Sequence, residues 1–227
     1  PNPNAAHETY QKHLGNPLRL FRYRGYMVGI LLNVCLYAAI VPFFVILGLY
    51  LQNICELSPQ MAGLVFMAVG TGFVLASSAG PMLMRRYSPS HVLICGTLCT
   101  GTGILAVLLG TITGLSTAIP FVLLALFVLG IGNGTVIPIS TGIVLRYLPM
   151  ADAGVGGAVL TTGQQLAGAL GIVFAGEFLM GDGASLASPA TYVDGLTLQV
   201  CAASAALCCA VCLSRTPAST QNTQRYM

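Results

Sequence analysis

Long apolar runs alternate with short polar breaks along this chain. Six of the runs are each long enough to cross the hydrocarbon core of a bilayer, which takes about 20 helical residues. The breaks between them hold Pro, Gly, Ser, Asn and charged residues, which are typical of turns. The pattern predicts six membrane-spanning helices, with polar tails at 1–26 and 214–227. The predicted spans are 27–51, 60–83, 91–111, 119–145, 153–179 and 193–213.

The composition agrees with a membrane setting. Hydrophobic residues make up 56% of the 227 positions and charged residues only 7%, whereas soluble domains carry about 25% charged residues. So little charge cannot coat a water-soluble globule, so the predicted fold class is an all-α integral membrane protein in contact with the lipid bilayer. The net charge of +3 is too small to indicate a nucleic-acid partner.

The basic residues all fall on one side of the predicted membrane. They precede the first span or follow the second, fourth and sixth spans. Because positively charged segments stay in the cytoplasm, both ends of the chain are predicted to be cytoplasmic. The nine residues are Lys12, Arg19, Arg22, Arg24, Arg85, Arg86, Arg146, Arg215 and Arg225.

A glycine cluster, "VLGIGNGTVIPISTG" at 128–142, lies inside the fourth predicted span. It is not a phosphate loop, because it lacks the third glycine of GxGxxG and no GK[ST] follows. An unpaired loop at mid-membrane would be costly, so this stretch should be helical. Small residues at four-residue spacing instead allow helices to approach closely. The fourth and fifth spans carry such rows, at Gly130, Gly134 and Pro138 and at Gly163, Ala167 and Gly171.

Two prolines should bend their helices, Pro42 in the first span and Pro138 in the fourth. Spans one and four also share a faint pattern, since "VPFFVILGLYLQ" (41–52) and "IPISTGIVLRYLP" (137–149) each run from Pro to Tyr-Leu. Such internal similarity is typical of transporters built from a 3+3 inverted repeat. These glycines and prolines serve either packing alone or the rocking of helices during a transport cycle.

Polar side chains inside the spans are the candidate site residues, because they are costly in lipid. They either line an aqueous cavity for substrate or act as hydrogen-bonding glue between helices. The candidates are Asn33, Tyr37, Asn133, Thr161, Gln164 and Gln165.

No feature of the sequence indicates an enzyme, a metal site or a cofactor. HExxH and GxSxG motifs are absent, and the cysteines lie mostly in apolar runs without basic neighbours that would stabilise thiolates. No Asp, Glu, Lys, Arg or His lies near the middle of a span, so these helices lack an obvious proton carrier.

Four stretches of the sequence resemble the C-terminal half of a major facilitator superfamily transporter of the fourteen-helix drug:proton antiporter branch. The fifth-span stretch is the most specific of them. They are "NPLRLFRYRGYM" (16–27), "LYLQNICELSPQMAGLVFM" (49–67), "FVLGIGNGTVIPISTGIVL" (127–145) and "AGVGGAVLTTGQQLAGALG" (153–171).

The resemblance implies the last six helices of such a transporter, with its N-terminal half missing here and the coupling acids mostly in that half. It implies a bacterial inner membrane, and it places the first, second, fourth and fifth helices beside the substrate path. One motif departs from the family. After "SSAGPMLM" the family usually has Asp-Arg and a glycine, whereas this chain has Arg85, Arg86 and Ser88.

The hypothesis that follows is half of a secondary transporter that exports small amphipathic molecules in exchange for protons. One alternative is a major facilitator carrier for a defined metabolite. The other is a membrane scaffold subunit that transports nothing. The lack of a basic residue at mid-span favours apolar or cationic cargo, and the amide cluster of the fifth span favours transport over a scaffold.

Overall fold

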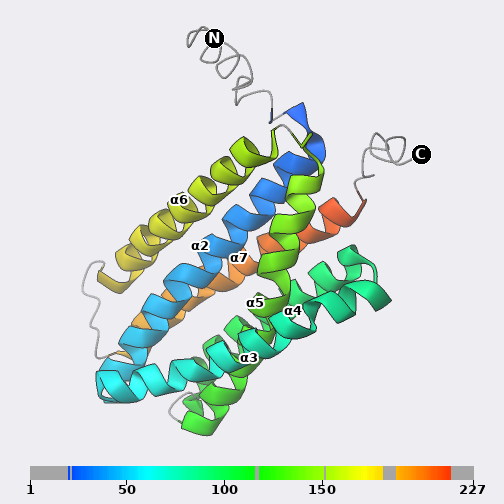
Figure 1. The fold of residues 1–227 in the computed structure, drawn as a ribbon. Helices are drawn as coiled ribbons and strands as arrows, with labels where there is room; N and C mark the ends of the chain where they lie inside the picture. The colour runs from blue at the N-terminus through cyan, green and yellow to red at the C-terminus, as the bar shows by residue number, and fades with distance from the viewer. Residues whose placement is uncertain (1–19, 21, 116–117, 151, 181–187, 216–227) are drawn as a thin grey trace, which may run out of the picture.

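The computed structural model describes residues 20, 22–115, 118–150, 152–180 and 188–215. This part of the chain forms six long helices, each long and apolar enough to cross a membrane (Figure 1). They are α2 (Arg24–Asn53), α3 (Pro59–Arg86), α4 (Pro89–Thr113), α5 (Ile119–Arg146), α6 (Ala153–Met180) and α7 (Pro189–Arg215).

Each predicted span lies within one of these helices, which extend beyond it at one or both ends. Helix α2 begins at Arg24, three residues before the predicted start of the first span. At about 1.5 Å per residue, helices of 25 to 30 residues exceed the roughly 30 Å hydrocarbon core. Hydrophobicity indicates only the residues that lie in lipid, so the predicted spans do not include the polar ends of the helices.

Two of the helix starts are set by a Ser-Pro pair. The Ser58 hydroxyl accepts a hydrogen bond from the Met61 backbone nitrogen at 3.4 Å, and Ser88 does the same for His91 at 3.4 Å. In each case the following proline occupies the first turn, where its missing N–H costs nothing. The α4 helix ends at Gly114, whose φ of 75° suits glycine.

The six helices form two triplets in chain order, α2–α4 and α5–α7, and each helix packs mainly on helices of the other triplet. Helix α2 packs on α6 and α7 of the other triplet, α5 packs on α3 and α4, and α4 packs on α7. Figure 1 shows α6 lying along α2. Exchanging α2, α3 and α4 for α5, α6 and α7 leaves this set of packed pairs unchanged. That is the packing of a 3+3 repeat, and it accords with half of a major facilitator fold.

The glycine cluster of α5 is helical and lies between α3 and α4. A β-carbon added at Gly130 would collide with the Val69 carbonyl oxygen of α3, and one at Gly134 would collide with that of Phe73. One added at Gly132 would collide with the Thr100 backbone of α4. Gly130 and Gly134 therefore allow close approach of α3, whereas Gly132 allows close approach of α4. A glycine at every second position thus serves two neighbouring helices.

The small-residue row of α5 was predicted to continue through Pro138, but within the described helices its packed part ends at Gly134. Pro138 is exposed, and a β-carbon at Gly142, one turn further on, would meet nothing within 4 Å. The row of α6 does pack as a row. Ala167 and Gly171 are buried, and a β-carbon at Gly171 would press on the Pro42 ring of α2. One at Gly163 would lie 3.8 Å from Val34 of α2.

Both α2 and α5 continue as helices through their internal prolines, Pro42 and Pro138. Pro42 is buried against α6, whereas Pro138 lies on the uncovered side of α5. The two prolines therefore occupy different surroundings despite their similar place in the two helices.

Candidate functional site

Asn33 is the centre of a buried polar junction between three helices. Its side chain is 0% exposed. Its Oδ1 accepts hydrogen bonds from Gln164 Nε2 of α6 at 2.9 Å and from Ser140 Oγ of α5 at 3.2 Å. Its Nδ2 donates to the Gly29 carbonyl oxygen at 2.9 Å. One amide thereby joins the first helix of one triplet to two helices of the other.

Close approach of the backbones makes this junction possible. A β-carbon at Gly29 would collide with Val144 of α5, and one at Gly25 would collide with the Tyr147 ring. On the α6 side, the Tyr26 hydroxyl donates to the Gly156 carbonyl oxygen at 2.7 Å. The start of α2 is therefore fixed against the end of α5 and the start of α6.

A second polar contact joins α4 to α5. Asn133 is 3% exposed, and its Oδ1 accepts a hydrogen bond from the Thr100 hydroxyl at 3.1 Å. Asn133 thus lies seven residues before Ser140 on α5 and binds a different helix. The structure brings Asn33 and Gln164 together but leaves Asn133 in a separate pair.

Gln199 of α7 is a buried amide that the sequence analysis missed. It is 1% exposed, and with its amide nitrogen turned toward α2 it donates to the carbonyl oxygens of Ala38 and Ala39 at 2.9 and 3.1 Å. The signal was present, since Gln199 is the only amide side chain in the predicted sixth span. Ser140 and Thr100 were missed because hydroxyl groups commonly bond to their own helix.

The other candidates are more accessible. Thr161 and Gln165 are exposed on α6, and Tyr37 of α2 is half-buried. The Thr161 hydroxyl donates to the Gly157 carbonyl oxygen of its own helix at 3.0 Å. Gln164 and Gln165 are adjacent in sequence but differ in role, because Gln164 turns into the junction while Gln165 lies on the outer face of α6.

The basic residues of the described helices lie at helix ends. Arg85 and Arg86 are in the last turn of α3, Arg146 is in that of α5 and Arg215 in that of α7. A cation in the last turn complements the negative end of the helix dipole. Arg85 and Arg86 are both exposed. Among the described residues, no three His, Cys, Asp or Glu side chains gather in a group able to hold a metal ion.

Comparison with known proteins gives one family and several relatives. Residues 2–223 match the sequence profile of the Major Facilitator Superfamily. A puromycin resistance protein of Streptomyces alboniger is 29% identical over 163 residues, which cover 67% of this chain and 31% of that protein. A multidrug resistance protein B homolog of Mycobacterium tuberculosis is 25% identical over 168 residues, covering 73% and 31%.

A riboflavin transporter of Clostridioides difficile is also similar. It is 27% identical over 163 residues, which cover 71% of this chain and 35% of the transporter. In each of these three comparisons the match spans about a third of the length of the relative.

Proposed function

The chain belongs to the major facilitator superfamily, and on that basis we propose that it is the C-terminal half-domain of a secondary transporter. We propose further that the whole protein exports small amphipathic molecules in exchange for protons. It would do so across the inner membrane of a bacterium, with both ends of this chain in the cytoplasm and an N-terminal half completing the cargo path.

The packing of the six helices is the observation that carries the half-domain proposal. The set of packed pairs is unchanged when the two triplets are exchanged, which is the organisation of inverted-repeat transporters. The export of amphipathic cargo is supported by relatives whose names describe resistance to puromycin and to multiple drugs.

Exposure divides the candidate residues into two proposed roles. Three buried amides hydrogen-bond to neighbouring helices, so their proposed role is to hold the half-domain together. They are Asn33, Asn133 and Gln164. Gln165 and Thr161 are exposed on α6, so they are the candidates to meet cargo or the other half of the protein. Tyr37 is intermediate between the two groups.

The proton-carrying acids are proposed to lie in the rest of the protein. The acidic residues of α6 and α7, Glu177 and Asp194, lie within the outermost two turns of their helices. A group at that depth is in the interfacial region, where it is hydrated and its charge needs no partner in the membrane.

Cargo accumulation in cells that express the full-length protein tests the proposal. We expect a fluorescent lipophilic cation to accumulate less than in cells without the protein, and a proton uncoupler to abolish the difference. Gln165→Leu should weaken export while leaving the amount of inserted protein unchanged, with the neighbouring exposed residue Leu166, changed to Ala, as the matched control. Uncoupler-insensitive export would contradict proton exchange.

A carrier for one defined metabolite is the second candidate, because a riboflavin transporter is among the relatives. The same cells distinguish the two functions. A metabolite carrier should move labelled riboflavin or a compound of similar polarity and leave the lipophilic cation unaffected. Movement of neither compound, with normal insertion, would favour the scaffold alternative.

A further inference from the structure

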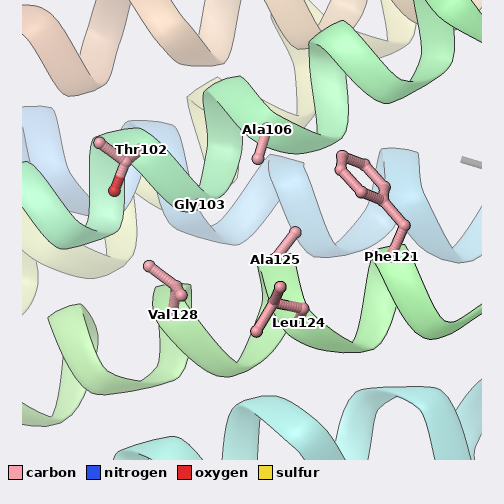
Figure 2. A pocket seen from close by; sticks show the side chains of 7 residues that line it. All are labelled: Thr102, Gly103, Ala106, Phe121, Leu124, Ala125 and Val128. Carbon is pink, nitrogen blue, oxygen red and sulfur yellow. The ribbon is translucent and has the colours of Figure 1, made fainter. Parts of the chain in front are cut away.

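An apolar groove lies between α4 and α5, away from the polar junction at Asn33. Its volume is about 240 Å³. Figure 2 shows Thr102 and Ala106 on α4 facing Leu124, Ala125 and Val128 on α5 across the groove, with the Phe121 ring at one end. Gly103 also lines it.

Two tight contacts between the helices limit the length of the groove. At one end a β-carbon on Gly103 would lie 2.6 Å from that of Leu129, and at the other a β-carbon on Gly110 would collide with the Phe121 ring. Gly103 and Gly110 are seven residues apart, which is about 10 Å along a helix. Between them, small side chains on both helices leave the space open.

The groove lies within the hydrocarbon depth of the membrane. Phe121 is two residues inside the start of α5, and Thr102 is eleven residues before the end of α4. At about 1.5 Å per residue, the groove runs from about 3 to 16 Å below the helix ends that the α4–α5 connection joins. It therefore lies in one leaflet.

The groove is open on the side that no other described helix covers. Helix α5 meets α3 through Gly130 and Gly134, α4 through Gly132 and α2 through Ser140. Its Leu124 side chain remains 64% exposed, and on α4 the neighbouring Leu105 and Leu109 are 39% and 51% exposed. An exposed leucine-rich rim at this depth is suited to contact with acyl chains.

Water is a poor occupant of this space. A buried water needs two to four polar partners. The only side-chain polar group in the lining is the Thr102 hydroxyl, which already donates to the Cys99 carbonyl oxygen at 2.9 Å. No charged group lies in the lining, so an ionic head group is not bound there either.

We propose that this groove binds a segment of one acyl chain of a bilayer phospholipid. An alkyl chain matches the dry, apolar lining, the narrow shape and the depth. Whole drug-sized ligands take pockets of about 300–1,000 Å³, which exceeds the space here. The bound segment replaces missing side-chain volume and so supports the α4–α5 packing. The proposal does not depend on which cargo the protein moves.

Tryptophan quenching by brominated lipid tests this assignment, because the chain contains no tryptophan of its own. Leu124→Trp places the only indole at the rim of the groove. Leu64→Trp is the matched control, since it lies on the exposed face of α3, five residues inside the start of that helix, as Leu124 does in α5, and it is not part of the groove. The full chain is reconstituted in phosphatidylcholine vesicles that contain a lipid brominated midway along one acyl chain.

We expect at least twofold stronger quenching of the groove probe than of the control at equal brominated-lipid content. Filling the groove with Ala106→Phe should remove the excess and leave the control probe unchanged. Thr102→Leu is a second filling variant, at an exposed position that tolerates a larger side chain.

Equal quenching of the two probes, or an excess that neither filling variant reduces, would overturn the proposal. Weaker quenching at the groove than at the control would also overturn it, because a protein segment would then cover the site. Loss of the excess on adding a lipophilic cation would assign the groove to cargo and would reject the lipid, whatever the result of the export assay.

Discussion

Gly72 of α3 lies directly against the backbone of α5. A β-carbon there would collide with the Phe127 carbonyl oxygen and would lie 3.0 Å from the Ile131 nitrogen. Backbone atoms cannot rotate away as a side chain can, so the two helices would have to separate. Gly70 is two residues away on the same helix, and a β-carbon there would meet nothing within 4 Å.

Gly72→Ala should therefore destabilise the protein by about 1–3 kcal/mol, as overpacking does. Gly70→Ala is the matched control and should be neutral or slightly stabilising, because alanine favours a helix more than glycine does. The free energy of unfolding, measured by denaturant titration in mixed micelles, checks both variants. Equal stability of the two would show that α3 and α5 do not touch at Gly72.

The bond between Asn33 and Gln164 sets a second expectation at the scale of the residue. Asn33→Leu and Gln164→Leu should be coupled, because each removes the partner of the other. Interhelical hydrogen bonds in membranes are worth about 0.6–1.7 kcal/mol, and the double-mutant cycle should give a value in this range. Asn33→Leu combined with Gln165→Leu should be additive, since Gln165 lies on the exposed face. Coupling of Asn33 with Gln165 instead of Gln164 would show that Gln165 is the amide that hydrogen-bonds to Asn33 and would contradict this expectation.

Helix pairing follows from which small residues face which neighbour. Helix α6 lies on α2 through its row of small residues, and a β-carbon at Gly168 would lie 3.3 Å from that of Val41. That separation is close to the Cβ–Cβ distance of about 3.5–4.5 Å found in disulfides. A cross-link between these positions therefore tests whether α2 of the first triplet packs on α6 of the second.

Val41→Cys with Gly168→Cys should form a disulfide on mild oxidation in a variant whose eight native cysteines are replaced. With a protease site inserted after Met150, which is 91% exposed, the two fragments should stay linked until reductant is added. Val41→Cys with Val173→Cys is the control, because Val173 is 66% exposed. Cross-linking of the control pair but not of the first would place another face of α6 against α2.

Sequence alone predicted the helices better than their partners. A stretch such as 119–145 is apolar over most of its length, so its length indicates a span, but the run says nothing about which side meets α3. The alternation of Gly130, Gly132 and Gly134 encodes two neighbours, yet either face could have met any other small-residue row. Within the described helices the packed part of this row ends before Pro138, because equal spacing does not guarantee an equal neighbour.

The polar site was predicted by residue type but not by role. Asn33 and Gln164 were identified because amides are costly in lipid, and the structure joins them. The sequence could not separate Gln164 from Gln165, since adjacent residues on a helix point about 100° apart and only the neighbouring helices decide which is buried. Ser140 and Gln199 were missed, because a single hydroxyl or amide in an apolar run gives a weak signal.

At the scale of the whole molecule, the account depends on six crossings that leave every lysine and arginine on one side. Arg24 lies at the start of α2, whereas Arg86 and Arg146 lie at the ends of α3 and α5. If successive helices cross in opposite directions, these three helix ends are on the same side of the membrane. The proposed cargo path, the predicted cytoplasmic ends and the leaflet proposed for the α4–α5 groove all depend on this topology.

Accessibility of single cysteines in intact cells measures that topology most directly. The full chain carries one introduced cysteine at a time in the cysteine-free background, at Glu56, Leu115, Arg86 or Met150. Introduced positions are preferable to the native Cys55, because burial raises the pKa of that thiol and so lowers its reactive thiolate fraction. A membrane-impermeant maleimide should label positions 56 and 115 in intact cells, and positions 86 and 150 only after the membrane is permeabilised. Labelling of 86 and 150 from outside, with 56 and 115 protected, would contradict the account.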